Sequence, residues 1–232
     1  FNKQIIDSTK DFCVAFKINT AFYESVGSSG WNSMKKTLDY IPKNILRIAD
    51  AKRGDIGNTS KKYAEAFFEN LNFDAITLSA YMGVETLTHY NSYENKWCII
   101  LALTSNAGSS DFQTVVDCEG VPLYERVIKS SLKLKRSDNV MFVVGATNDK
   151  HYDNIRKIAP DNFLLVPGVG AQGGNLETVS NKLINKDCGI LINSSRSIIY
   201  SGTDKDFAKC ARDSAKSLQI DMQKILQNNN IV

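Results

Sequence analysis

The sequence predicts an α/β protein with a parallel sheet covered by helices, folded as a single domain over residues 1–232. Strand-like runs alternate with helical stretches along the chain, which is the order of a parallel sheet with helical crossovers. The runs are almost continuously apolar, as expected for strands buried on both faces. No linker or low-complexity tract divides the 232 residues, and seven β/α units of this total length fit a barrel or a doubly wound sheet.

The predicted strands are short β-rich runs bounded by polar residues, glycine or proline. In chain order they are Phe12–Asn19, Leu46–Ala51, Ala75–Leu78, Trp97–Leu103, Val140–Val144, Phe163–Val166 and Gly189–Ile192. The helical stretches between and after them are Trp31–Tyr40, Ser60–Asn70, Val84–Tyr90, Pro122–Leu132, Asp149–Ile158, Leu176–Ile184 and Asp204–Gln227. Residues that favour helix starts support these helix assignments, because Asn58, Thr59 and Ser60 can cap a helix and Pro122 suits a first helical turn.

The composition excludes several classes of protein. Hydrophobic residues make up 43% of the chain, which is enough for a core and argues against whole-chain disorder. No apolar run approaches the roughly 20 residues of a membrane span, and the first residues lack the pattern of a secretory signal. The 28 basic residues are dispersed among 25 acidic ones, which argues against a nucleic-acid surface.

The cysteine and histidine content points to a reducing compartment and away from zinc chemistry. Five cysteines occur without a C-x-x-C pair: Cys13, Cys98, Cys118, Cys188 and Cys210. We therefore expect free thiols and a cytoplasmic location. The two histidines, His89 and His151, have no ligand-like spacing, which disfavours a metal site and a histidine-based triad.

The densest polar cluster, Asp50–Thr59, closes an apolar run. Alternation along a strand places Asp50 and Lys52 on one face, together with Ile48, which would line a barrel interior. Asp55 falls beyond the strand, at the carboxyl end of the sheet where α/β folds build their active sites. The cluster is therefore the first candidate for catalysis.

Lys17 has a similar place near the carboxyl end of the run Phe12–Asn19, and a charge in a buried strand needs a partner. If the first two strands are neighbours, the partner is Asp50, in an alternating network of Lys17, Asp50, Lys52 and Asp55. One interpretation is a structural ion-pair network at a barrel mouth. The other is chemical, because a lysine between two carboxylates stays protonated and can deliver a proton.

A second constellation suits a phosphate group. Val166–Gly174 carries four glycines in seven positions, so that backbone N–H groups can approach an oxyanion closely. Arg196, in the segment Asn193–Ser197 after the last strand, can grip a phosphate with two N–H groups. The loops after the last two strands are the usual phosphate site of a (β/α)8 barrel.

These motifs resemble those of the orotidine 5′-monophosphate decarboxylase family, in its longer bacterial branch. D-A-K-R-G-D-I-G-N-T at Asp50–Thr59 looks like the family signature, and P-G-V-G-A-Q-G-G at Pro167–Gly174 resembles its phosphate loop. Ser195–Ser197 resembles the segment that carries its phosphate arginine. The similarity runs through essentially the whole chain and includes Phe16–Asn19, Ala21–Glu24 and Leu103–Asn106.

The resemblance implies a (β/α)8 TIM barrel, a homodimer, and neither a metal nor an organic cofactor. It implies conversion of orotidine 5′-monophosphate (OMP) to UMP and CO2, the last step of pyrimidine synthesis. The expected partners are this substrate and product and a second copy of the chain, with no nucleic acid and no membrane.

Matching the motifs residue by residue implies the roles of the site residues. Lys52 is the implied proton donor to C6, Asp50 lies against the departing carboxylate, and Lys17 holds Asp50 and the ribose. Asp55 and Thr59 are implied to reach across the dimer interface from the other subunit. The implied substrate-binding residues are Ser105 at the pyrimidine edge and, around the phosphate, Pro167, Gln172, Gly173 and Arg196.

One departure from the family pattern concerns the start of the barrel. The family begins with a strand that reads roughly F-C-V-G-L-D, and its aspartate binds the ribose. The run Phe12–Lys17 is superficially similar, but its neighbours match the second strand of the family. We therefore expect seven strands, as in a barrel whose first β/α unit is missing from the given chain, either because the sequence is a piece of a longer protein or because the barrel is truncated.

Two other functions fit parts of the pattern. Sugar-phosphate decarboxylases and hexulose-phosphate synthases resemble D-x-K-x-x-D barrels with a phosphate site, but they use a magnesium ion. The full R-G-D-I-G-N-T continuation at Arg53–Thr59 favours the nucleotide enzyme. A non-catalytic nucleotide-phosphate-binding barrel would keep the phosphate grip without turnover.

Overall fold

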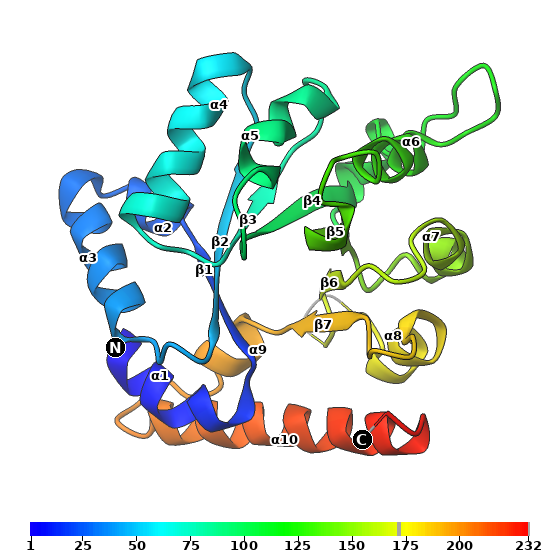
Figure 1. The fold of residues 1–232 in the computed structure, drawn as a ribbon. Helices are drawn as coiled ribbons and strands as arrows, with labels where there is room; N and C mark the ends of the chain where they lie inside the picture. Colours follow the sequence, from blue (N-terminus) through cyan, green and yellow to red (C-terminus); the bar gives the residue numbers. More distant parts are fainter. Residues whose placement is uncertain (171–172, 232) are drawn as a thin grey trace.

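The computed structural model describes residues 1–170 and 173–231 and contains one sheet of seven parallel strands that curls into a nearly closed barrel (Figure 1). The strands are β1 (Ala15–Asn19), β2 (Leu46–Arg53), β3 (Ala75–Leu78), β4 (Trp97–Leu103), β5 (Val140–Val144), β6 (Leu164–Pro167) and β7 (Ile190–Asn193). Their order in the sheet is their order in the chain. The seven predicted strands are thereby confirmed. Within the described residues no pairing joins β1 to β7, so the barrel is open between them.

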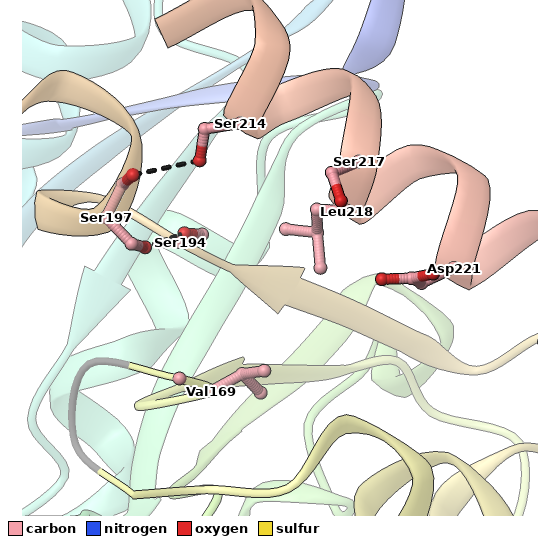
Figure 2. A pocket seen from close by; sticks show the side chains of 8 residues that line it. Val169, Ser194, Ser197, Ser214, Ser217, Leu218 and Asp221 are labelled. Carbon is pink, nitrogen blue, oxygen red and sulfur yellow. Dashed lines mark hydrogen bonds between the residues drawn. The ribbon is translucent and has the colours of Figure 1, made fainter. Parts of the chain in front are cut away.

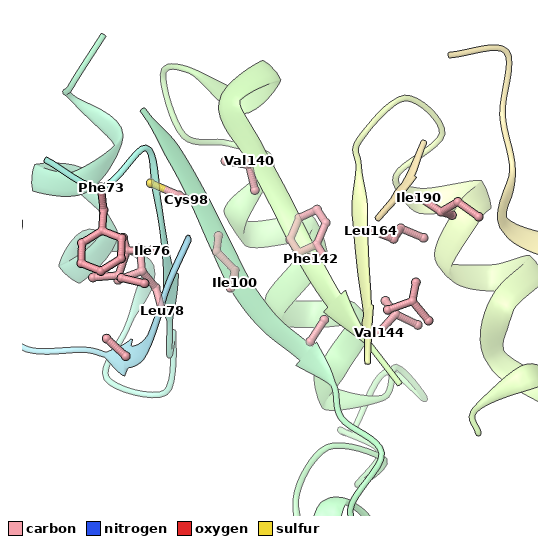
Figure 3. Packing of buried hydrophobic residues seen from close by; sticks show 14 of the residues in the cluster. Phe73, Ile76, Leu78, Cys98, Ile100, Val140, Phe142, Val144, Leu164 and Ile190 are labelled. Atoms are coloured by element: carbon pink, nitrogen blue, oxygen red, sulfur yellow. The ribbon is translucent and has the colours of Figure 1, made fainter. Parts of the chain in front are cut away.

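Both faces of the sheet are buried, which explains the continuous apolar runs. Alternate residues of five strands meet in the barrel interior: Ile48, Ala75, Ile99, Met141, Val143 and Leu165. The residues between them point outward to the helices, and Figure 3 shows this packing for Ile76, Ile100 and Phe142. The predicted interior position of Ile48 is confirmed, since its side chain is only 1% exposed.

The helices cover the outside of the sheet and fill the connections (Figure 1). They are α1 (Asn2–Thr9), α2 (Ala21–Glu24), α3 (Gly27–Tyr40), α4 (Gly57–Ala64), α5 (Thr88–Asn91), α6 (Leu123–Ser131), α7 (Tyr152–Ile158), α8 (Leu176–Leu183), α9 (Arg196–Ile199) and α10 (Phe207–Asn228). The predicted helix Ser60–Asn70 begins earlier, at Gly57, and continues from Glu65 to Asn70 as a π-helical segment. No described helix has the length and apolar character needed to cross a bilayer.

Three helices were not predicted, namely α1, α2 and α9. The last two have four residues each, too few for a helical period to be visible in the sequence. Helix α1 buries Ile5, Ile6 and Thr9 and packs along α10, with the rings of Phe1 and Phe207 stacked at 5.2 Å. This contact joins segments from opposite ends of the chain, which local sequence cannot reveal.

Arg156 of α7 ties together the connections at the amino-terminal end of β6 and β7. Its guanidinium group donates hydrogen bonds of 2.6–3.3 Å to five backbone carbonyls, those of Ala159, Pro160, Asn162, Leu183 and Gly189. No carboxylate of the described residues lies within salt-bridge distance of the Arg156 guanidinium group. Burial lowers the pKa of Arg156 to about 10. Its partners are therefore backbone carbonyls of the two connections that precede β6 and β7.

Candidate active site

Three charged side chains meet at the carboxyl end of the first two strands. In the β1–β2 register Lys17 lies opposite Ile48, and Asn19 opposite Asp50, so Lys17 and Asp50 share the interior face. The Lys17 Nζ atom lies 2.6 Å from Asp50 Oδ2, and the Lys52 ammonium group donates to Asp50 Oδ1. The structure thus brings Lys17, Asp50 and Lys52 together as the alternating pattern predicted.

The three side chains differ in exposure. Lys17 and Asp50 are 14% and 10% exposed, whereas Lys52 is 51% exposed. Burial alone raises the pKa of the Asp50 carboxyl group, but the charge of Lys17 and the hydrogen bonds from Lys17 and Lys52 outweigh it, so the pKa is lowered. The result is a fixed, buried Lys17–Asp50 pair with a second ammonium group, that of Lys52, open to a ligand.

Asp50→Asn should destabilise the protein at neutral pH, by about 2 kcal/mol, because two lysines lose the carboxylate between them. Because the pKa of Asp50 is lowered by folding, this stabilisation is present above the usual carboxyl pKa of 3.8. It is lost as the pH falls below that value toward the folded pKa. Urea unfolding of both proteins between pH 7 and pH 3 measures the difference. A difference that stays constant over that range would contradict the assigned ion pair.

The backbone at Lys52 is irregular. Its φ is 49°, in the left-handed region that residues other than glycine rarely adopt. The β2–β3 register shifts between Ala49 and Arg53, so a β-bulge contains Asp50 and Lys52. The predicted proximity of these two side chains is confirmed, although regular strand alternation, from which it was predicted, is interrupted there.

Asp55 is not part of this ion-pair cluster in the single chain. Its carboxylate accepts a hydrogen bond from the backbone N–H of Ile56 at 2.8 Å, and no salt bridge to it occurs among the described residues. Thr59 is exposed in the first turn of α4. The predicted four-member network is therefore wrong for the isolated chain, because the loop that follows β2 carries Asp55 away from the other three.

Arg53 fixes the end of β2 next to the cluster. Its guanidinium group pairs with Glu24 of α2 and donates to the Ala51 carbonyl at 2.9 Å. It also lies over the rings of Tyr63 and Phe67, at 5.3 and 5.4 Å from their centroids. These contacts link β2 to the helices on both sides, a role that sequence reasoning missed.

The segment that carries Ser105 follows β4 and is held on both sides. The Gln113 side chain accepts the N–H of Thr104 at 2.7 Å, and the Asn148 side chain donates to the Thr104 carbonyl at 2.9 Å. A Cβ at Gly145 would lie 2.7 Å from the Ser105 Cβ, so only glycine allows this close approach. Ser105 is thereby presented at the carboxyl end of the barrel.

The loop from Ser105 to Gly120 has local structure of its own. A 3-10 turn spans Ala107–Asp111, and an isolated bridge pairs Val116 with Pro122. Arg126 of α6 forms salt bridges with Asp117 and Glu119. Gln113, which contacts Thr104, was not identified from the sequence, because nothing local distinguishes it from other loop amides.

The predicted phosphate residues lie on two adjacent loops. Pro167 ends β6 opposite Asn193 of β7, and Gly168, Gly170 and Gly173 all have positive φ. Arg196 is exposed at the start of α9. Gln172 lies outside the described residues. A cavity of about 320 Å³ opens beside these loops, lined by Gly170, Ser194 and Ser197 and by Ser214 and Leu218 of α10 (Figure 2).

No group of three or more His, Cys, Asp or Glu side chains among the described residues is arranged to hold a metal ion. All five cysteines have free thiols, as predicted.

Comparison with known proteins identifies the family. The model of the orotidine 5′-phosphate decarboxylase / HUMPS family matches residues 2–210. The chain belongs to this family. Orotidine 5′-phosphate decarboxylase of Phocaeicola vulgatus is 51% identical over 229 residues, which cover 97% of this chain and 84% of that protein. The enzyme of the same name from Flavobacterium johnsoniae is also 51% identical, over 98% of this chain and 84% of its own length.

Solved structures confirm the barrel. The structure of Leishmania donovani OMP decarboxylase superimposes with a TM-score of 0.87 at 34% sequence identity, covering 97% of this chain and 86% of that one. Family membership and fold therefore agree, and the predicted TIM barrel is confirmed.

Proposed function

We propose that this chain decarboxylates OMP to UMP and CO2, with Lys52 as the proton donor to C6. The reaction is that of its relatives, and the enzyme is a cofactor-independent lyase of pyrimidine biosynthesis. The observation that carries the proposed mechanism is the ion-pair cluster of Lys17, Asp50 and Lys52 at the carboxyl end of the barrel.

In the proposed reaction the bond between C6 and the carboxylate breaks, and its electron pair stays on C6. The Lys52 ammonium group stabilises the developing negative charge and then transfers a proton to C6, which leaves a neutral amine that solvent reprotonates. Two features support this role. The contact with Asp50 Oδ1 fixes the position of the Lys52 ammonium group, and the 51% exposure of Lys52 leaves that group accessible to substrate.

Asp50 has a second proposed role, toward the substrate carboxylate. Lys17 balances its charge and fixes its orientation through the 2.6 Å contact. A carboxylate of lowered pKa stays ionised and disfavours the bound carboxylate more than the CO2 that replaces it. This role and the stabilisation of the C6 carbanion act in the same direction, and the latter is the larger contribution in preorganised sites.

We assign the substrate's remote groups to the two other parts of the site. Ser105, held by the contacts to Thr104 on either side, meets the pyrimidine edge. Pro167, Gln172, Gly173 and Arg196 bind the phosphate, since glycines of positive φ allow backbone N–H groups to converge and arginine can donate two hydrogen bonds. Binding energy from these remote groups can be used at the reacting carbon.

We further propose that the enzyme is a homodimer in which Asp55 and Thr59 complete the site of the partner subunit. Asp55 is half-buried, and its carboxylate accepts the Ile56 N–H and takes no part in the Lys17–Asp50–Lys52 cluster of its own chain among the described residues. Beside it Ile56 is exposed, and on the neighbouring loops Tyr81 and Phe112 are 81% and 63% exposed, with ring centroids 6.5 Å apart. Exposed apolar groups near a site support contact with a second chain. The free thiols support a cytoplasmic location.

The test of the reaction is the ultraviolet absorbance of OMP incubated with the enzyme in excess EDTA. We expect the substrate band to be lost and UMP to accumulate. A metal-dependent sugar-phosphate enzyme would not act under these conditions. A non-catalytic nucleotide-binding barrel would bind UMP without consuming OMP. An enzyme that is inactive in EDTA, or a protein that binds UMP without consuming OMP, would contradict the proposal.

A further inference from the structure

The bulge in β2 leaves one residue of β3 opposite three residues of β2. Ala49 pairs with Ile76, and the next pair is Arg53 with Leu78. Between these pairs Asp50, Ala51 and Lys52 are opposed by a single residue, Thr77. A bulge of this size interrupts the regular ladder, so the N–H of Lys52 has no backbone carbonyl of β3 in register.

The Thr77 hydroxyl group takes the place of the missing ladder partner. It accepts the backbone N–H of Lys52 at 2.9 Å. The same hydroxyl group can donate its proton to one of two acceptors. Asp50 Oδ1 lies 3.2 Å from Thr77 Oγ1, and the Ala49 carbonyl oxygen lies 3.5 Å away. The carboxylate is the stronger acceptor because it is ionised. One hydroxyl group therefore binds the main chain of Lys52 and the side chain of Asp50 at once.

The surroundings make this hydroxyl group hard to replace. Thr77 is 1% exposed, so water does not reach its Oγ1 atom from the surface. Lys52 adopts a φ of 49°, which is unfavourable for a side chain with a Cβ and persists only where neighbouring contacts impose it. Without the hydroxyl group, the Lys52 N–H would lose its hydrogen-bond acceptor.

We propose that Thr77 is a positioning residue for the decarboxylation, holding Asp50 and Lys52 in their relative geometry through its single buried hydroxyl group. The inference rests on the proposed function, because that function gives Asp50 and Lys52 their roles. Thr77 itself touches neither C6 nor the substrate carboxylate in this assignment. It acts on the reaction through the two residues that do.

The test compares Thr77→Val, which keeps the shape and removes the hydroxyl group, with Thr77→Ser, which keeps the hydroxyl group. The matched control is Thr9→Val in α1, where a buried threonine hydroxyl likewise donates one hydrogen bond, to the Ile5 carbonyl at 2.7 Å. For each variant kcat and KM for OMP are measured, together with UMP affinity. Thr77→Ala supplies the same loss of the hydroxyl group if the valine variant does not fold.

We expect Thr77→Val to lower kcat by about tenfold to a hundredfold, since misplacement of a catalytic group by about 1 Å can cost up to about a hundredfold. KM and UMP affinity should change less than about threefold, and Thr77→Ser should recover most of kcat. Thr9→Val should keep the kcat of the wild type. A kcat within twofold of the wild type in Thr77→Val, or a serine variant as slow as the valine variant, would overturn the proposal.

A crystal structure of Thr77→Val gives a readout that does not depend on turnover. We expect the φ of Lys52 to leave the left-handed region and the distance between Lys52 Nζ and Asp50 Oδ1 to increase. An unchanged Asp50–Lys52 segment would overturn the proposal whatever the kinetics. Absence of OMP turnover in the wild-type enzyme would instead contradict the proposed function, so the two failures are distinguishable.

Discussion

Replacement of Lys52 by alanine should abolish turnover while leaving UMP binding within about tenfold of the wild type. Loss of a general acid alone costs roughly 10²–10⁴-fold in rate, and Lys52 is also the proposed stabiliser of the C6 carbanion. The proposed phosphate and base contacts lie on other loops, so product affinity should survive. Steady-state decarboxylation rates and calorimetric UMP titration measure the two quantities.

The control for this substitution is Lys62→Ala. Lys62 lies on α4, its side chain is 65% exposed, and it pairs with Glu65 on the protein surface. An exposed pair of this kind contributes about 1 kcal/mol or less, so Lys62→Ala should keep both turnover and stability. Turnover by Lys52→Ala within tenfold of the control would refute the proton-donor assignment.

Arg156→Met should have the largest effect on stability, lowering the free energy of unfolding by about 3–5 kcal/mol. Methionine fills most of the space but donates no hydrogen bond, so carbonyls that now accept from the guanidinium group would be left without it. Those carbonyls belong to the connections that precede β6 and β7, and the loss should loosen that end of the barrel. Urea unfolding measures the change.

Arg136→Met is the comparison for this prediction. Arg136 pairs through its guanidinium group with Glu94, whose side chain is 76% exposed, so solvent can replace the lost contact. We expect a loss of less than about 1 kcal/mol there. Equal losses of unfolding free energy for Arg136→Met and Arg156→Met would show that the buried carbonyl contacts of Arg156 stabilise the fold no more than an exposed ion pair does.

The strands could be predicted from the sequence because both faces of the sheet are buried, which leaves uninterrupted apolar runs such as Val140–Val144. The end of β2 was less predictable. The strand continues through Arg53, two residues beyond its apolar part, because polar contacts from Thr77 and Glu24 hold that end in place. Helix α1 was missed because its stability depends on contacts with α10, 200 residues away along the chain.

The ion-pair cluster could be predicted because Lys17, Asp50 and Lys52 are charges in otherwise buried strands, and such charges need partners. Thr77 gave a weaker signal as the one polar residue in the run Ala75–Leu78, and threonine is common in strands for reasons of shape alone. Gln113 and Asn148 gave none, since their contacts with Thr104 depend on how two loops fold back onto β4.

The place of Asp55 could be inferred only from the family resemblance. Its motif spacing is that of the signature, yet among the residues the structure describes its carboxylate accepts a hydrogen bond only from the neighbouring Ile56 N–H. A residue that acts in the partner subunit makes its functional contacts there, so neither the sequence nor the structure of a single chain reveals them. We therefore propose that two copies of the chain share one site, with Lys52 from one and Asp55 from the other.

Mixing Lys52→Ala and Asp55→Ala proteins, each inactive alone, tests that claim most directly. A hybrid dimer would contain one site with both residues intact and one site with neither. Equal amounts that exchange freely should therefore recover about one quarter of the wild-type rate, since half of the dimers are hybrids with one working site each. Native mass spectrometry establishes the exchange. Recovery near that level is the predicted result; no recovery in a sample with proven hybrid dimers would contradict the shared site.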